Sequence, residues 1–335
     1  MVTEPRGVVV ALTPWNDPVA IACGLIGAAL AVGNTVIHKP SERSPQVGEL
    51  LTKILAGALP EDVLTWVCGN GGVGAALAAH PDVDVVAHVG STRAGQSIAR
   101  GSTVKVLLEN GGNDPLLVDA DVDPRWAAGQ AALGAFTNAG QLCTSVERIY
   151  VHRAIAEPFT VVLAERARAL VTGLLVDTRM RDAVHEHVQD AVSAGARVLV
   201  GGFVPEGPGS SYPNTVLAGC TPDTRVMREE TFGPVAPACV VEGFDEGLAQ
   251  ACSGGYGLAA TVLTRDMEHA QRACRDLPVG TVKINVVFGG APGGAAQPRG
   301  TSGTGFGYGP ELLDEFTTTK VVHWTTEAPA WRHRR

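Results

Sequence analysis

The residue best placed for covalent chemistry is Cys143, in the stretch Gly140-Gln141-Leu142-Cys143-Thr144. An apolar run from Trp126 to Phe136 predicts a helix before this stretch, and the β-rich segment Ser145–His152 follows it. A thiol on such a turn can be presented into a cleft, where its pKa can be lowered and its sulfur can attack an electrophilic carbon. Because the chain has seven cysteines and free cysteine is usually a small buried hydrophobe, the neighbours of Cys143 must decide between the two interpretations.

Strands and helices are expected to alternate before this stretch. The predicted strands are Val8–Leu12, Thr35–His38, Val63–Cys68, Val83–His88 and Val104–Leu108. The predicted helices are 18–32, 44–58, 72–79 and one that begins at Gly90–Gly95. Since the strands are apolar throughout and the connections are short, the pattern predicts a parallel sheet covered by helices on both faces.

Parallel sheets of this kind bind ligands beyond the carboxyl ends of their strands. Four turns with polar residues fall there: Pro14–Asp17, Lys39–Glu42, Gly90–Gly95 and Glu109–Gly112. A glycine-bounded turn before a helix can bind phosphate through backbone N–H groups, although one such turn alone is a weak signal. Lys39 and Glu42 could equally be solvated surface charges. Glu109 directly follows a buried strand, so burial could raise its pKa toward that of a general base.

Composition limits the classes of function. The 335 residues are 45% hydrophobic and 18% charged, which predicts a soluble globular chain with two domains. A formal net charge of −8 without a basic block argues against a nucleic-acid partner. The apolar run Val19–Val32 is too short to span a membrane.

The cysteines and histidines give no sign of a metal site. The scattered cysteines have no CxxC spacing, which argues against a disulfide framework or a zinc site and indicates the reducing cytoplasm. His185 and His187 are spaced i, i+2, which splays the rings apart, so no metal site is expected and a solvated helix face is predicted for them.

Taken in chain order, these residues resemble the motifs of the aldehyde dehydrogenase superfamily, and the match runs nearly end to end. The matching segments are Pro5–Val9, Pro14–Asn16, Gly33–Val36, Lys39–Glu42, Gly90–Thr92, Glu109–Gly112, Asn138–Cys143, Glu229–Val235, Tyr256–Leu258, Gly280–Val282 with Asn285, and Ser302–Gly305. The order and spacing of so many motifs make the signal specific, which no single motif would be.

The resemblance implies oxidation of an aldehyde to a carboxylic acid with NAD(P)+. Cys143 would attack the aldehyde carbon to form a thiohemiacetal, and hydride transfer would leave a thioester. The amide of Asn16 and the backbone N–H of Cys143 would hold the oxygen as its charge develops. Glu109 would activate the water that hydrolyses the thioester.

The resemblance also implies the binding residues. Those expected to contact the cofactor are Trp15, Lys39, Ser41, Glu42, Gly90, Ser91, Glu230 and Phe232, and those expected to line the substrate pocket are Asp17, Leu142 and Thr144. A carboxylate at Glu42 would repel a 2′-phosphate, so NAD is favoured over NADP, although Lys39 would tolerate either.

The implied architecture is α/β, with a Rossmann-like cofactor domain over residues 1–114 and a second α/β catalytic domain over residues 115–310. Residues 311–335 would return to the cofactor domain, and a last strand at Lys320–Trp324 would pair between subunits of a homo-oligomer. Compared with the usual family pattern, the region before the Pro-Trp-Asn motif is short.

Several positions near the expected pocket depart from the usual pattern: His88, Asn110, Asn113, Lys283 and the segment 295–300, together with Asp17 beside the oxyanion asparagine. These departures indicate either an unusual, more polar substrate or relaxed selection on turnover, and they motivate the hypothesis that Asp17 contacts a polar or cationic substrate group. They also keep two alternatives open: a non-redox enzyme that uses Cys143 and Glu109 for acyl transfer, condensation or isomerisation, and a non-catalytic partner subunit.

Overall fold

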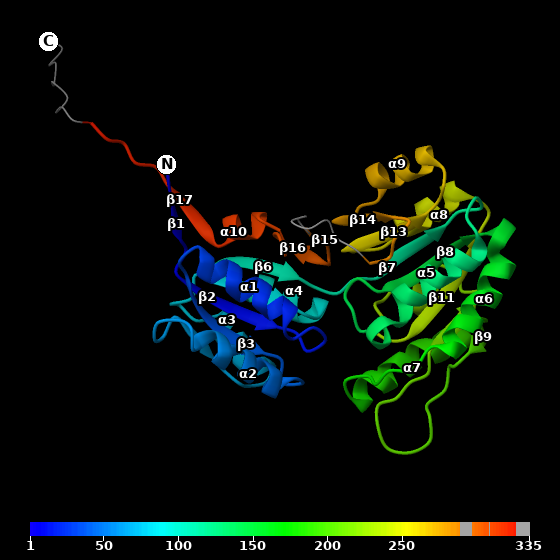
Figure 1. Ribbon diagram of the computed structural model, residues 1–335, viewed down its shortest axis with the longest axis horizontal. Coiled ribbons are helices and arrows are strands. Elements are labelled where there is room, and N and C mark those ends of the chain that lie inside the picture. Colours follow the sequence, from blue (N-terminus) through cyan, green and yellow to red (C-terminus); the bar gives the residue numbers. More distant parts are fainter. Residues whose placement is uncertain (289–296, 308, 326–335) are drawn as a thin grey trace, which may run out of the picture.

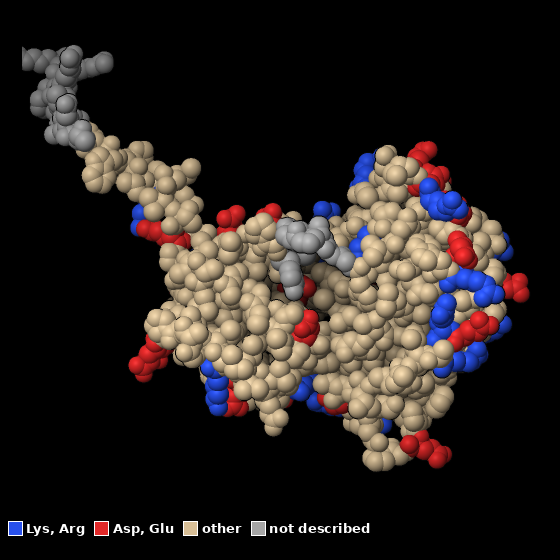
Figure 2. Space-filling view, in the orientation of Figure 1, with Lys and Arg blue, Asp and Glu red and all other residues tan. Residues whose placement is uncertain are grey.

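The computed structural model describes residues 1–288, 297–307 and 309–325 of the chain. They form two lobes, each built on its own sheet with helices packed against it (Figure 1). The surface is hollowed between the lobes (Figure 2). Of the altered segment 295–300, residues 295 and 296 lie outside the described residues.

The first lobe contains a six-stranded sheet in the order β16-β6-β5-β2-β3-β4. Its parallel strands are β2 (Val8–Thr13), β3 (Thr35–Pro40), β4 (Leu64–Trp66), β5 (Val85–Val89) and β6 (Lys105–Glu109). The helices between them are α1 (Ala20–Ala31), α2 (Pro45–Ala56), α3 (Gly71–Ala78) and α4 (Thr92–Gly101). The predicted alternation of strands and helices is confirmed, with boundaries that differ by a few residues.

Strand β2 shows why these strands are apolar throughout. Val9 and Ala11 pack into a core with α1, whereas Val10 and Leu12 face the opposite side, with Ala78 of α3. Both faces of the strand are therefore removed from water, and alternation of polar and apolar residues is lost.

The second lobe contains a seven-stranded sheet in the order β14-β13-β7-β8-β11-β10-β9. The strands are β7 (Asp114–Val118), β8 (Val146–His152), β9 (Arg197–Val200), β10 (Thr215–Ala218), β11 (Val235–Val241), β13 (Ala259–Leu263) and β14 (Thr281–Ile284). Only the β9–β10 pairing within this sheet is antiparallel. The strand that follows Cys143, β8, lies in the middle of the sheet.

Helices cover both faces of this second sheet. They are α5 (Pro124–Phe136), α6 (Ala156–Ala169), α7 (Thr178–Ser193), α8 (Phe244–Ala251) and α9 (Met267–Asp276). Buried side chains of α5 and α6 form one core with the sheet, and those of α7, α8 and α9 form the other. The rigid centre of this lobe therefore supports the turn between α5 and β8, which carries Cys143.

The chain returns to the first lobe after β14. Strand β15 (Arg299–Gly300) pairs with β12 (Tyr256–Gly257), and β16 (Gly303–Thr304) pairs antiparallel with β6. After the short helix α10 (Glu311–Glu315), β17 (Thr317–Lys320) pairs with β1 (Val2–Pro5).

The strand predicted at Lys320–Trp324 is wrong in position. The strand forms over Thr317–Lys320, because that segment has β1 as its partner and the register ends where Val2 meets Lys320. Residues 321–325 form no strand in the chain as described.

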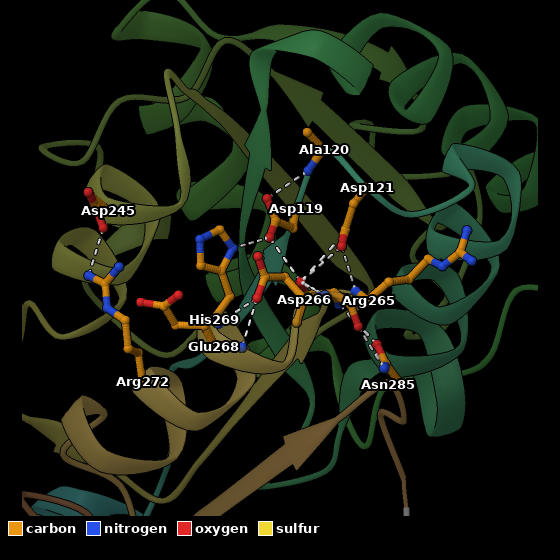
Figure 3. A network of polar contacts seen from close by, with 11 residues as sticks. Asp119, Ala120, Asp121, Asp245, Arg265, Asp266, Glu268, His269, Arg272 and Asn285 are labelled. Atoms are coloured by element: carbon orange, nitrogen blue, oxygen red, sulfur yellow. Dashed lines mark hydrogen bonds and ion pairs between the residues drawn. The ribbon is translucent and has the colours of Figure 1, made fainter.

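A polar network fastens the ends of three strands in the second lobe (Figure 3). The Asp119 carboxylate, just after β7, accepts a hydrogen bond from the Thr264 hydroxyl at 2.9 Å and contacts Nδ1 of His269 on α9 at 2.6 Å. The Asn285 side chain, just after β14, bonds both the N–H and the C=O of Thr264. The network is remote from the turn that carries Cys143 and serves to hold α9 against the sheet.

The helices are short relative to a lipid bilayer. The helix that contains the apolar run in the first lobe, α1, has 12 residues, and α7 has 16. Within residues 1–288, 297–307 and 309–325, no helix is both long and apolar enough to cross a membrane.

Candidate active site

A backbone reversal places Cys143 at the start of β8. After α5, residues Asn138, Ala139 and Gly140 all adopt left-handed conformations, with φ of 52°, 55° and 71°. Two of these are not glycine and are strained, so the surrounding structure must hold them in place. At Gly140 a Cβ atom would lie 2.1 Å from the carbonyl oxygen of Gly233, so only glycine fits.

The buried side chain of Gln141 secures this reversal. Its amide nitrogen donates to the carbonyls of Asn138 at 3.0 Å and Leu174 at 3.1 Å, and its oxygen accepts from the N–H of Val176 at 2.9 Å. Sequence reasoning gave Gln141 no role. The available signal was a glutamine directly after a glycine at a predicted helix end, where a buried amide must find backbone partners.

The thiol of Cys143 meets the carboxylate of Glu109 across the lobes. The Cys143 Sγ donates to Glu109 Oε1 at 3.6 Å. The predicted pairing of nucleophile and base is therefore present, with Glu109 at the end of β6. Burial raises the pKa of Glu109, as expected, while the bond from Cys143 opposes that shift.

The expectation that this setting lowers the pKa of Cys143 is wrong for the isolated chain. Burial raises the pKa of the thiol well above its ordinary value, and the charges of Glu109 and Asp114 raise it further. The raised pKa favours the neutral thiol, so a base must take its proton before the sulfur of Cys143 can act as a nucleophile.

Asn16 lies against the same reversal. Its amide nitrogen donates to the Gln141 carbonyl at 3.0 Å, and the Asn138 amide donates to the Asn16 carbonyl at 3.3 Å. The neighbouring Trp15 ring packs edge-on against Phe232, with the ring centroids 5.6 Å apart. The structure thus brings the first lobe's Pro-Trp-Asn turn to the loop that carries the nucleophile.

The segment with Glu230 and Phe232 closes another side of the site. A carboxylate oxygen of Glu230 accepts from the Gly112 N–H at 2.9 Å. A Cβ atom at Gly111 would lie 2.0 Å from the other oxygen, so a residue with a side chain there would displace Glu230. Burial raises the pKa of Glu230 to about 7, against the effect of the Gly112 bond.

The remaining sequence-predicted cofactor residues lie at the carboxyl ends of β3 and β5. Lys39 is buried, and its ammonium group donates to the Pro40 carbonyl at 3.2 Å and lies 3.7 Å from a carboxylate oxygen of Glu42. The Ser41 hydroxyl accepts from the N–H of Arg43. These three side chains are neighbours at one edge of the sheet, as predicted.

The Gly90-Ser91 turn opens α4. The Ser91 hydroxyl accepts from the Ala94 N–H at 3.3 Å and caps the helix, while other N–H groups of the first turn have no partner within the helix. Such a helix N-terminus favours an anion. Gly90 also admits the His88 ring, since a Cβ atom there would lie 2.7 Å from His88 Cε1.

Buried polar atoms without hydrogen-bond partners lie beside this turn, and they bear on whether a dinucleotide fits there. Both ring nitrogens of His88 and the hydroxyl of Thr92 are buried without a hydrogen-bond partner. Burial, the largest effect, and the charge of Lys39 lower the pKa of His88 to about 4, while a backbone contact with Ser91 opposes the shift, so its ring is neutral. Buried polar groups normally have partners, and the polar ribose and phosphate groups of NAD(P) would supply one for the Thr92 hydroxyl at the start of α4. Together with the N–H groups of the first turn of α4, these residues fit the cofactor.

Of the three expected pocket residues, two lie beside Cys143 in the chain and the third lies on the turn before α1. Leu142 and Thr144 flank Cys143 and are half-buried. One carboxylate oxygen of Asp17 accepts from the Ala20 N–H at 3.2 Å, at the start of α1. The substrate hypothesis did not include this bond to the helix start. The bond uses one oxygen of Asp17, so the other could bind a ligand.

A buried polar cluster lies behind the nucleophile. One oxygen of Asp114 accepts from the Ala259 N–H at 3.1 Å, and the other has no partner. Lys283 donates to the carbonyl of Val287 at 2.8 Å. Arg148 donates to three backbone carbonyls, those of Asn113, Ser253 and Ala251. The Arg148 and Lys283 side chains therefore bond backbone carbonyls, and neither forms a direct ion pair with Asp114 among the described residues.

The solvated helix face predicted for the two histidines of α7 is wrong for His187. It is buried and its Nδ1 contacts the Thr231 hydroxyl at 3.1 Å, because α7 packs against the segment that carries Glu230. His185 contacts the Tyr212 hydroxyl at 3.0 Å. In the part of the chain that the structure describes, no group of three or more metal-binding side chains comes together.

Comparison with known proteins identifies the family. The model of the aldehyde dehydrogenase family matches residues 1–322. The chain belongs to the aldehyde dehydrogenase family. The sequence-based expectations of a two-part α/β fold, aldehyde oxidation and use of NAD(P) are thereby confirmed.

Three relatives show the breadth of this likeness. The α-ketoglutarate semialdehyde dehydrogenase of Haloferax volcanii is 36% identical over 96% of this chain and 70% of its own length. The structure of lactaldehyde dehydrogenase from Escherichia coli matches with a TM-score of 0.93 and 33% identity, over 96% of this chain and 70% of that one. The betaine aldehyde dehydrogenase of Staphylococcus aureus, in complex with NAD+, matches with a TM-score of 0.89 and 30% identity, over 97% of this chain and 70% of that one. The chain thus spans about 70% of the length of each.

Stability should depend on pH through the buried Asp114. Burial, the largest effect, raises its pKa from 3.8 to about 7. The folded state therefore holds this proton at pH values where the unfolded state has lost it, so the free energy of unfolding should fall as pH rises from about 4 to about 7. Urea denaturation across this range should show a smaller decline for Asp114→Asn. An identical slope in the variant would show that Asp114 is not a source of the dependence.

Proposed function

We propose that Cys143 is the nucleophile, Glu109 the general base and Asn16 the oxyanion donor for oxidation of an aldehyde to a carboxylic acid. The observation that carries this proposal is the 3.6 Å contact between Cys143 Sγ and Glu109 Oε1. The bond from Asn16 to the Gln141 carbonyl supports it, because it holds the Asn16 amide beside the same loop.

The first half of the reaction forms a bond to sulfur. As Cys143 Sγ attacks the aldehyde carbon, the thiol proton passes to Glu109, whose raised pKa makes it a better base than an exposed carboxylate. The aldehyde oxygen becomes an oxyanion, which the Asn16 amide and the Cys143 backbone N–H stabilise. The product of this half is a thiohemiacetal on Cys143.

The second half returns the free thiol. When bound, NAD(P)+ supplies the acceptor for the hydride that leaves the thiohemiacetal carbon. Once its proton has been released, Glu109 takes a proton from water, and the resulting hydroxide attacks the thioester carbon. The C–S bond then breaks, giving the carboxylic acid and Cys143.

The binding residues divide between the two ends of the cofactor. Lys39, Ser41 and Glu42 would bind the adenosine ribose, and the turn at Gly90 and Ser91, with Trp15 nearby, would bind the pyrophosphate. Glu230 and Phe232 would position the nicotinamide ribose and ring. The contacts of Glu230 with the Gly112 N–H and of Phe232 with the Trp15 ring support this assignment.

The division into a cofactor domain at 1–114, a catalytic domain at 115–310 and a returning segment at 311–335 is also proposed. The change from the first sheet to the second between Glu109 and Asp114 supports the first boundary. Strand β16 lies within the proposed range 115–310 but pairs with β6, so it would be assigned to the cofactor domain.

The identity of the aldehyde is open among several classes. The three relatives named above are a lactaldehyde, a betaine aldehyde and an α-ketoglutarate semialdehyde dehydrogenase, so family membership does not select the substrate. The free oxygen of Asp17 supports a polar or cationic group on the substrate, in which case Asp17→Asn would raise KM for it.

A homo-oligomer is proposed from the exposed apolar surface. The β1–β17 ribbon extends from the first lobe (Figure 1), and the segment after it exposes Val321, Val322 and Trp324, the last at 85%. An open groove of about 680 Å³ beside α9 and β14 offers a second copy an apolar surface.

The reducing cytoplasm is proposed as the compartment. All seven cysteines are free, which supports this proposal, and cell fractionation would test it.

The roles of Cys143 and Glu109 predict different failures. Cys143→Ala should abolish aldehyde-dependent NADH formation, measured by absorbance. Glu109→Gln should slow turnover by roughly 10²- to 10⁴-fold, because both the attack of the thiol and the hydrolysis of the thioester lose their base, and stopped-flow absorbance should show that the first turnover of NADH is slowed as well. Full activity in Cys143→Ala, or a wild-type rate in Glu109→Gln, would contradict the assignment.

Cofactor preference should depend on the charge of Glu42. The carboxylate disfavours a 2′-phosphate by repulsion, so Glu42→Gln should lower the ratio of the kcat/KM values for NAD and NADP. The ratio is measured by steady-state kinetics with each cofactor, with Glu49→Gln, a substitution elsewhere on the same lobe, as the control. An unchanged ratio in Glu42→Gln would remove Glu42 as the source of selectivity.

The oligomer should depend on the apolar segment after β17. Light scattering should give a particle mass that is a multiple of 34.7 kDa, and Val322→Lys with Trp324→Ser should lower it, because charge and lost apolar area disfavour burial. A wild-type protein that stays monomeric at micromolar concentration would refute the proposal.

A further inference from the structure

A buried carboxylate on β8 has no part in the chemistry described so far. Glu147 lies four residues after Cys143, in the middle of the second sheet, and is 4% exposed. Its Oε2 accepts from the N–H of Thr231 at 2.8 Å, and its Oε1 accepts from the N–H of Phe232 at 2.9 Å. One side chain thus satisfies two consecutive backbone donors.

The segment that it binds carries both side chains assigned to the nicotinamide end of the cofactor. The Glu230 side chain accepts a hydrogen bond from the Gly112 N–H. The Phe232 ring packs against the Trp15 ring in a T-shaped contact. Phe232 has a φ of 51°, a left-handed conformation that a bulky residue adopts only under constraint. The Glu147 carboxylate supplies that constraint at its backbone nitrogen.

A carboxyl group suits this pair of donors and a carboxamide does not. Both carboxyl oxygens can accept, most strongly in the ionised form, whereas a carboxamide presents one acceptor and one donor. With glutamine at this position, one of the two N–H groups would face an NH₂ group and lose its partner. Leaving a buried donor unpaired costs about 1–3 kcal/mol, which the segment would relieve by moving.

Ionisation of Glu147 is costly. Burial, the largest effect, raises its pKa to about 8 and the charge of Glu230 adds to the shift, while the two N–H bonds favour the carboxylate and oppose it. Within the described residues no ion pair compensates it, since the adjacent Arg148 donates to backbone carbonyls. An apolar side chain would avoid this cost but would leave the N–H groups of Thr231 and Phe232 without partners, so the carboxyl group serves the segment that it binds.

We propose that Glu147 is a positioning residue that sets the affinity of the chain for the nicotinamide end of NAD(P) by holding Glu230 and Phe232 in place. The inference rests on the proposed function, which assigns those two residues to the cofactor. Glu147 itself touches neither the aldehyde nor the nucleophile.

The test compares cofactor binding with chemistry that needs no cofactor. In Glu147→Gln, the loss of one charge-assisted hydrogen bond should raise the Kd for NAD roughly tenfold, measured by isothermal titration calorimetry on the full chain. Hydrolysis of p-nitrophenyl acetate without cofactor requires only the Cys143 nucleophile and the Glu109 base, so its rate should be unchanged. Steady-state kinetics should show a raised KM for NAD.

The matched control is Asp119→Asn, which also converts a buried carboxylate to an amide but in the remote network of Figure 3. It should lower stability and leave the Kd for NAD unchanged. If Glu147→Gln does not fold, Glu147→Asp, whose shorter side chain cannot reach both N–H groups equally, takes its place with the same expectation.

Three results would overturn the inference alone: an unchanged Kd for NAD in the Glu147 variant, an equal loss of ester hydrolysis, or an equal rise in Kd in Asp119→Asn. Failure of the wild-type chain to bind NAD at all would instead overturn the proposed function on which the inference rests.

Discussion

The reactive centre depends on the left-handed reversal at Asn138–Gly140. That reversal brings the chain from the end of α5 to the start of β8 within a few residues, so the thiol projects toward the first lobe and not into its own core. The Gln141 amide holds it through three backbone groups, and Asn16 bonds the same loop from the other lobe. The relative positions of Cys143, Glu109 and Asn16 therefore depend on one strained turn and the amides that surround it.

The electrostatics of the site set a second constraint. Burial raises the pKa values of Glu109, Asp114, Glu147 and Glu230 together, and the nearby cations donate to backbone carbonyls. Under these conditions the thiol stays neutral at rest, which limits its reaction with adventitious electrophiles. Its chemistry depends on proton transfer to a contacting carboxylate, so geometry matters more than an intrinsically acidic thiol.

Local features could be predicted from the sequence, and long-range ones could not. The apolar strands and the turns at their carboxyl ends follow from periodicity and glycine placement, and the resemblance pointed to Cys143, Glu109 and Asn16, which the structure places near one another. The burial of His187 depends on a segment more than forty residues away, and the raised pKa of Cys143 depends on its burial and on the charges of Glu109, Asp114 and Glu230. The last strand was misplaced because its partner, β1, lies at the other end of the chain.

The return of the chain to its first lobe also bears on how the protein is made. Strand β16 forms the edge of the sheet next to β6, and the buried Phe316 packs into the core under α1. During synthesis from the N-terminus, the first sheet therefore has an open edge and an incomplete core until residues 303–316 have left the ribosome. The lobe that is translated first can be among the last parts to finish folding, and contacts across such sequence separations make that step slow.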